Sequence, residues 1–132
     1  RGTLAEALTY AMEPSSYPRQ AMVAALASVG LQRLEPLLDK PGRWEREVSI
    51  DEQLLLGFAR VVLQAPRWLV MDEAFSALDD DTLERIIDVL NGSLAHTGII
   101  HIGSAGDARD RLFTQVVHLV KAPNTVPEDL QP

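Results

Sequence analysis

The stretch that decides the fold is Trp68-Leu69-Val70-Met71-Asp72-Glu73. Its first four residues form a short, continuous apolar run, which is typical of a strand buried in a parallel sheet. The run ends in two adjacent carboxylates, and acids at the end of a buried strand need a partner. In phosphoryl-transfer enzymes one such acid holds Mg²⁺, and the next can orient the attacking water and accept its proton. The pattern therefore makes Asp72 a candidate metal ligand and Glu73 a candidate general base, with a strand followed by an acidic helix cap as the alternative.

Helix and strand patterns alternate after these acids. Asp79 to Thr82 opens a helix, and residues 99–102 form a second apolar run. The apolar stripe of that helix consists of Leu83, Ile86, Ile87, Leu90 and Leu94. Residues 105–112 fit a further helix and 116–120 a third strand. This order predicts a parallel sheet with right-handed crossovers.

The first half of the chain has the pattern of helices. Candidate segments cover residues 3–12, 19–29 and 31–38, the last as a short helix or turn. Gly30 follows the second segment as a C-terminal cap. We therefore expect a helical subdomain at residues 1–65, an α/β part at 66–121 and a loose tail at 122–132.

One helix of this half has a clear start. Ser49 followed three residues later by Glu52 is a capping box, so a helix should begin near Ile50 and run to about Gln64, before Pro66. It is apolar on most faces and should be largely buried.

Composition limits the function. The chain has 132 residues, is 46% hydrophobic and carries a net charge of -7, without a cysteine. Its lysines are Lys40 and Lys121, so no basic stripe could bind nucleic acid. No apolar stretch approaches the roughly 18 residues that span a bilayer. Because the sequence begins at Arg1 rather than Met, we expect it to be part of a longer protein, and the fragment itself to be soluble.

Several segments together resemble the ATP-binding-cassette (ABC) ATPase family over nearly the whole chain. Leu69-Val70-Met71-Asp72-Glu73 resembles the Walker B strand, and Ser76-Ala77-Leu78-Asp79 matches the D-loop that follows it. Val48-Ser49-Ile50-Asp51-Glu52-Gln53 stands where the signature LSGGEQ occurs. The opening residues 1–10 are similar to the segment after the Q-loop, GTLREQLLYP, and with Trp44 resemble the SbmA/BacA-like and peroxisomal fatty-acyl type of fused exporter.

The resemblance implies an α/β fold: a partial P-loop NTPase (RecA-like) parallel sheet with an attached helical subdomain. It implies ATP and Mg²⁺ as cofactors of the complete protein. The implied partners are a transporter membrane domain and a second ATP-binding domain, in a homodimer or a heterodimer, at the cytoplasmic face of a membrane. By the same resemblance Glu73 is catalytic and Asp72 binds the metal. The implied nucleotide-binding positions are Ser49, Asp51, Gln53, Asp79 and Ser104.

The chain departs from the family in its phosphate-binding parts. It contains neither the loop G-x-x-x-x-G-K-[ST] nor the Q-loop glutamine, so we expect no tight ATP site and no turnover from these residues alone. Ile50 and Asp51 replace the signature glycines, and their side chains would crowd a phosphate. The alternative for Asp51 is an acid that stabilises the first helical turn, and for Ser49 an N-cap.

The switch histidine of the family is also replaced. Ser104 occupies its place; a serine donates one hydrogen bond but cannot carry the imidazolium charge. His101 lies three residues earlier on a strand and should face the other side.

Three functions remain open. The first is an ATP-hydrolysing component of an ABC transporter. The second is a degenerate, non-catalytic cassette half with an ATP-sensing or structural role. The third is an ABC ATPase outside transport, which the lack of basic patches disfavours. Without the phosphate-loop half, an open sheet face or edge also predicts a dimer or a swapped assembly.

Overall fold

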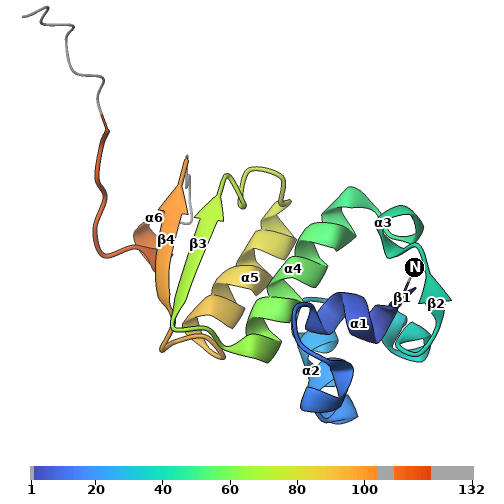
Figure 1. Ribbon diagram of the computed structural model, residues 1–132. Helices are drawn as coiled ribbons and strands as arrows, with labels where there is room; N and C mark the ends of the chain where they lie inside the picture. Colours follow the sequence, from blue (N-terminus) through green and yellow to red (C-terminus); the bar gives the residue numbers. More distant parts are fainter. Residues whose placement is uncertain (1, 104–108, 120–132) are drawn as a thin grey trace, which may run out of the picture.

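A helical half is followed along the chain by a small α/β half in the computed structural model, which describes residues 2–103 and 109–119, with the backbone alone at residues 109 and 110 (Figure 1). In chain order the elements are β1 (Gly2–Thr3), α1 (Leu4–Thr9), the 3₁₀ helix η1 (Pro14–Ser16), α2 (Arg19–Ser28), the 3₁₀ helix η2 (Gln32–Leu37), β2 (Pro41–Gly42), α3 (Trp44–Glu47), α4 (Ile50–Gln64), β3 (Trp68–Asp72), α5 (Asp80–Asn91), β4 (Gly98–Ile102) and α6 (Arg109–Leu112). Within the described residues, none of these helices has both the length and the apolar character needed to cross a membrane.

Helix α4 is the longest element and packs against both α1 and α2. Its predicted bounds are confirmed: Ser49 caps the N-terminus, and Ala65 ends the helix with a φ of 41° before Pro66. Leu56, Phe58 and Ala59 are buried, while the other apolar residues of α4 are mostly half-buried. The helix is therefore less deeply buried than its composition predicts.

The first helix is shorter than predicted. Residues 3–12 were expected to be helical, but α1 ends at Thr9. The hydroxyl of Thr9 donates to the carbonyl oxygen of Ala5 at 2.9 Å, so it bonds within its own helix. At the other end Thr3 and Glu6 form a second capping box. The predicted second helix is confirmed as α2, and Gly30 follows it with a φ of 82°.

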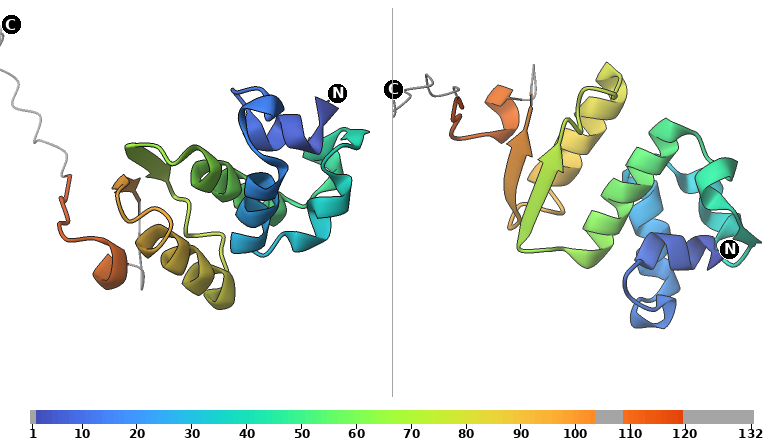
Figure 2. Two further views of the ribbon diagram at one scale, coloured as in Figure 1. Left: turned by 90° about the horizontal axis from the view of Figure 1, so that it is seen from below. Right: turned by 45° about the horizontal axis from the view of Figure 1, so that its top comes forward.

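Strands β3 and β4 form a parallel pair, as predicted from their apolar runs. The register runs from Trp68 opposite Gly98 to Asp72 opposite Ile102. Helix α5 packs along one face of this pair and buries Ile86, Ile87 and Leu90 (Figure 2). The α/β expectation is met in this β3–α5–β4 unit, while the larger RecA-like sheet is not formed by the described residues.

The third strand predicted at 116–120 is wrong for residues 116–119, which carry no strand; Val120 lies outside the described residues. A strand is held by hydrogen bonds to a neighbour, and in the described part of the chain β3 and β4 pair only with each other. Residues 109–112 of the helix predicted at 105–112 are helical as α6, and residues 105–108 are not described.

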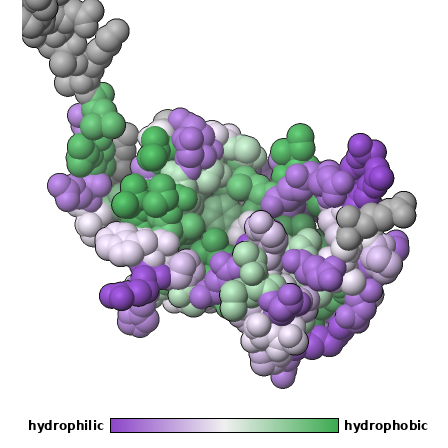
Figure 3. Space-filling model, in the orientation of Figure 1, coloured by the Kyte–Doolittle hydropathy of each residue, from purple (hydrophilic) through white to green (hydrophobic). Residues whose placement is uncertain are grey.

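The other face of the β3–β4 pair is open. Trp68, Val70, Ile100 and Ile102 project from it with exposed fractions of 67%, 61%, 49% and 55%. Figure 3 shows hydrophobic side chains gathered over this part of the surface. We call these four residues the open sheet face; on the opposite side Met71 is buried, while Leu69, Ile99 and His101 are half-buried.

Candidate functional site

The two predicted acids lie at the carboxyl end of β3 with exposed side chains. Asp72 is the last residue of the strand, and Glu73 leaves it with a φ of 48°, in the left-handed region that a side chain disfavours. The Glu73 amide donates to the carbonyl oxygen of Ile102 at 2.9 Å, which ties this turn to the end of β4. Such strained backbone is found most often at functional sites.

Gly103 lies directly against the Glu73 carboxylate. It follows β4 with a φ of 121°. A Cβ atom added to Gly103 would lie 2.8 Å from Oε2 of Glu73, closer than real Cβ atoms approach other atoms. The Glu73 carboxylate is therefore lined on one side by bare backbone.

The loop after Glu73 is held by two contacts near its start. The Ser76 hydroxyl donates to the Glu73 carbonyl oxygen at 2.8 Å, and the buried ring of Phe75 stacks on His101 with centroids 4.9 Å apart. His101 also stacks on Phe113, with centroids 5.8 Å apart. This packing joins the loop to β4, and His101 takes part in it as one of three stacked rings.

Asp79 begins α5 as its N-cap. Its Oδ1 atom accepts from the Thr82 amide at 2.8 Å, and this hydrogen bond is the main reason why the pKa of Asp79 is lowered. The carboxylate therefore has a helix-capping role in this structure.

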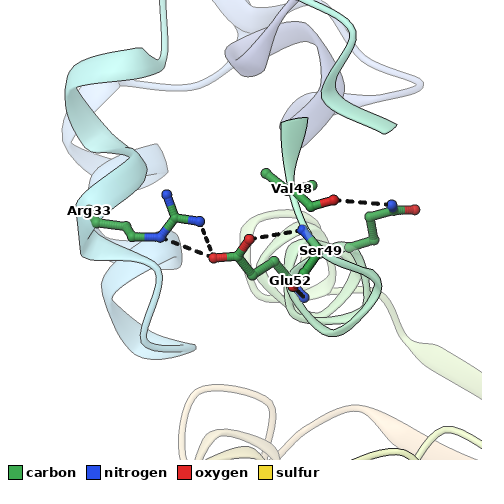
Figure 4. A network of polar contacts seen from close by, with 5 residues as sticks. Arg33, Val48, Ser49 and Glu52 are labelled. Atoms are coloured by element: carbon green, nitrogen blue, oxygen red, sulfur yellow. Dashed lines mark hydrogen bonds and ion pairs between the residues drawn. The ribbon is translucent and has the colours of Figure 1, made fainter. Parts of the chain in front are cut away.

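Side chains of the helix itself cap the N-terminus of α4 (Figure 4). The Ser49 hydroxyl accepts from the Glu52 amide at 3.2 Å, and the Ser49 amide donates to Oε2 of Glu52 at 3.0 Å. Arg33, from η2, donates through Nε to Oε1 of Glu52 at 3.0 Å. The Arg33 hydrogen bond, and then the Ser49 amide, lower the pKa of Glu52.

The remaining signature residues Ile50, Asp51 and Gln53 are all exposed, and Gln53 is held by hydrogen bonds to backbone carbonyls. Gln53 donates through Nε2 to the carbonyl oxygens of Glu45 at 3.1 Å and Val48 at 3.5 Å. Asp51 is exposed in the first turn, and Ile50 is 81% exposed at the tip of the helix. Ser104 lies outside the described residues.

Three element ends point to one side of the molecule: the carboxyl end of β3 and the N-termini of α4 and α5 (Figures 1 and 2). Asp72 and Glu73 are thus adjacent, and Asp79 starts the helix that follows them, whereas Ser49, Asp51 and Gln53 lie on the separate α4. Helix N-termini favour anions, and carboxylates favour Mg²⁺.

The exposed carboxylate of Asp72 is of a kind that can serve as one ligand of Mg²⁺. Among the described residues, no three His, Cys, Asp or Glu side chains gather closely enough to hold a metal ion by themselves. Mg²⁺ in nucleotide-dependent enzymes commonly takes one or two carboxylates, water and substrate phosphates. The exposed carboxylate of Asp72 matches one ligand of that donor set, and Glu73 follows it directly in the sequence.

Sequence reasoning missed Gly103 and Arg33 as parts of these sites. Neither has a local signal, because each meets its partner only after folding. The capping box of Thr3 and Glu6 was also missed, although Ser/Thr-x-x-Glu is visible in the sequence.

Comparison with known proteins shows which proteins this chain is similar to. No protein-family model matches the sequence. Its homologues are ATP-binding proteins of ABC transporters. The chain is 32% identical over 103 residues to an uncharacterized ABC transporter ATP-binding protein of Haemophilus influenzae, covering 78% of this chain and 17% of the relative. It is 38% identical over 97 residues to the methionine import ATP-binding protein MetN of Rhizobium meliloti, covering 69% of this chain and 25% of the relative.

A solved structure agrees in fold. The structure of a bacterial Atm1-family ABC exporter with ATP bound matches with a TM-score of 0.64 and 24% identity, over 77% of this chain and 18% of that one. At this identity the likeness shows the fold alone. The chain spans between 17% and 25% of the length of the two relatives described above. An importer component and an exporter both appear, so the exporter subgroup is not distinguished.

Proposed function

We propose that this chain is the C-terminal part of the ATP-binding domain of an ABC transporter, with a helical subdomain at 1–65, an α/β part at 66–121 and a tail at 122–132. Its homologues support the class. The observation that carries the proposal is the pair Asp72 and Glu73, exposed at the carboxyl end of β3. Ligands of open α/β sheets bind at the carboxyl ends of the strands.

The chemistry assigned to this pair is ATP hydrolysis. Glu73 orients a water molecule and accepts its proton, and Asp72 holds Mg²⁺ directly or through water. The metal, when bound, supplies positive charge to the phosphates. Asp79 holds the start of α5 beside the acids. The phosphate-binding loop has to come from outside these residues. We therefore expect the chain alone to bind ATP weakly and not to hydrolyse it.

The proposed setting is the cytoplasmic face of a membrane. The partners are a transporter membrane domain and a second ATP-binding domain, identical or different. Similarity of residues 1–10 and Trp44 to the fused SbmA/BacA-like and peroxisomal fatty-acyl type supports an exporter of that subgroup. With a net charge of -7, the chain is not proposed to bind nucleic acid.

A second candidate is a non-catalytic cassette half. The observation in its favour is the α4 N-terminus, where Ile50 is 81% exposed and the Ser49 hydroxyl already accepts the Glu52 amide. A phosphate approaching this helix end would meet side chains in place of bare amides. The signature positions Ser49, Asp51 and Gln53 would then serve the helix rather than the nucleotide.

ATPase measurement on the intact protein, with its membrane domain, separates the two candidates. Glu73→Gln should lower kcat by about 10²-fold or more while nucleotide binding persists, because loss of a general base costs about 10²–10⁴-fold. Glu13→Gln, at an exposed glutamate of the helical half, is the control. A wild-type protein that binds ATP without hydrolysing it supports the second candidate. An active protein whose rate survives Glu73→Gln contradicts the catalytic assignment.

A further inference from the structure

We propose that Gly103 is a positioning residue for the Glu73 carboxylate. The inference rests on the proposed function, since it deepens the role assigned to Glu73. Gly103 would act through its lack of a side chain, which leaves the space that the carboxylate occupies. Any larger residue there would turn the carboxylate away.

The sheet register brings the two residues together. Asp72 pairs with Ile102 as the last pair of β3 and β4, so Glu73 and Gly103 leave the sheet side by side. The Glu73 amide donates to the Ile102 carbonyl oxygen at 2.9 Å and extends this pairing by one bond. The backbone of Glu73 is therefore held directly beside the residue that precedes Gly103.

Both residues leave their strands with positive φ. The value is 48° at Glu73 and 121° at Gly103. For glutamate this conformation costs of the order of 1–3 kcal/mol, whereas glycine adopts it without penalty. The strained turn at Glu73 directs its side chain across the Gly103 backbone rather than along the strand.

There is no room for a side chain between Gly103 and the Glu73 carboxylate. A Cβ atom at Gly103 would lie 2.8 Å from Oε2 of Glu73 and would also overlap the rest of that carboxyl group. The group that it meets is the end of a flexible side chain, so the carboxylate would rotate away, and the φ of 121° adds backbone strain for which Gly30→Ala is the control. The expected effect of a methyl group is a misplaced base in a folded protein.

Two other glycines provide controls for the backbone and for the methyl group. Gly30 also has a positive φ, 82°, and an added Cβ there would meet the side chain of Arg85. Gly57 lies within α4, and an added Cβ there would meet no other atom of the described residues within 4 Å apart from its chain neighbours and the backbone of its own helix. Gly30→Ala thus introduces backbone strain without touching Glu73, and Gly57→Ala introduces neither.

The test uses the intact protein and measures kcat, nucleotide affinity and melting temperature. Gly103→Ala should lower kcat at least about tenfold, with nucleotide affinity changed by less than about threefold, because misplacement of about 1 Å costs up to 10²-fold. Gly30→Ala should lower the melting temperature and keep kcat. In a Glu73→Gln background Gly103→Ala should reduce kcat no further, since coupled residues are non-additive.

Several outcomes overturn the inference. One is full activity of Gly103→Ala; another is an equal further loss in the Glu73→Gln background. If Gly103→Ala lowers the melting temperature as well as kcat, the test is repeated in a Glu73→Ala background, where the carboxylate is absent. There Gly103→Ala should lower the melting temperature by no more than Gly30→Ala does. A decrease as large as the one in the wild-type background contradicts the proposal. If the proposed function is wrong, ATPase activity should survive Glu73→Gln by itself. In that case the melting temperatures measured in the Glu73→Ala background still test the contact between Gly103 and the Glu73 carboxylate.

Discussion

Arg60 donates a hydrogen bond through Nη2 to the carbonyl oxygen of Ala7 at 2.6 Å and so joins α4 to α1. Its guanidinium carbon lies 5.8 Å from the centre of the Tyr10 ring. Gln64, one turn further along α4, donates to the Tyr10 carbonyl oxygen at 2.9 Å. The C-terminal end of α1 leaves carbonyls without helical partners, and α4 supplies donors to this region.

Substituting Arg60 should therefore destabilise the helical half. Arg60→Met keeps much of the stem packing but leaves the Ala7 carbonyl without its donor, and we expect a loss of about 1.5–3 kcal/mol in the free energy of unfolding. Urea denaturation of the purified protein measures it. Arg19→Met is the matched control, because its 2.7 Å pair with Asp39 is exposed and such pairs contribute about 0–1 kcal/mol. Equal losses in the two variants would contradict the role of Arg60.

Acid should weaken the fold through Glu52. Its pKa is lowered in the folded protein from an ordinary value of 4.5, first by Arg33 and then by the Ser49 amide. A carboxyl with a lowered folded-state pKa stabilises fully above its unfolded value, and that contribution disappears as the pH falls through the folded value. The free energy of unfolding should thus decrease below about pH 4.5, and urea titrations between pH 7 and pH 3 follow it.

Glu52→Gln isolates this contribution. Glutamine keeps an acceptor for the Ser49 amide, so the capping box survives while the charge is lost. At pH 7 we expect a loss below about 1 kcal/mol, because the Arg33 side chain is 58% exposed. Asp79, whose pKa is lowered from 3.8 by the Thr82 amide, acts in the same direction at lower pH. Asp79→Asn retains a good N-cap but removes the charge, so this variant separates the contribution of Asp79 to the pH dependence from that of Glu52. A pH dependence unchanged in Glu52→Gln would contradict the assignment.

The ends of α4 were predictable because they are determined locally. The capping box of Ser49 and Glu52 lies within four residues, and Pro66 follows the last turn closely. Apolar runs likewise indicated β3 and β4, although the expected burial on both faces is not met, because only Met71 is buried in these strands. The acids of the candidate site followed from their place at the end of such a run.

Contacts between distant segments were not predictable from these patterns. Arg33 and Glu52 are 19 residues apart, and their ion pair depends on how η2 lies beside α4. The proximity of Glu73 and Gly103 depends on the register of β3 and β4. The strand expected at 116–120 is wrong for a related reason: an apolar run indicates strand propensity, but pairing requires a neighbour.

Restoring glycines at the α4 N-terminus should raise hydrolysis if this helix end faces a nucleotide. Ile50→Gly with Asp51→Gly would free the first amides of α4 and, in the intact protein, increase kcat by about tenfold or more, since single donors to a developing charge contribute about 10²–10³-fold. Stability should decrease by about 1 kcal/mol because Asp51 leaves the first turn and glycine is flexible. ATPase assays and melting curves measure both effects.

The same double change at another helix start is its control. Arg19→Gly with Gln20→Gly alters the equivalent first two positions of α2, which is not proposed to meet a nucleotide. That variant should lose stability without gaining activity. An unchanged kcat in the Ile50 and Asp51 variant, with ATP bound, would indicate that this helix end does not limit hydrolysis.

The open sheet face should make the isolated chain associate at high concentration. Val70 and Ile100 are 61% and 49% exposed on adjacent strands, and burying a side chain of this size contributes about 1.5–3 kcal/mol. Among the described residues, no further strand pairs with either edge of the β3–β4 pair, so strand pairing between copies is available. Light scattering should therefore show dimers or larger species, and Val70→Lys with Ile100→Lys should return monomers because charges oppose edge and face association.

Met12→Lys is the control, at a residue that is 54% exposed in the helical half, and it should leave association unchanged. A wild-type chain that stays monomeric at high concentration would show that the open sheet face does not drive self-assembly.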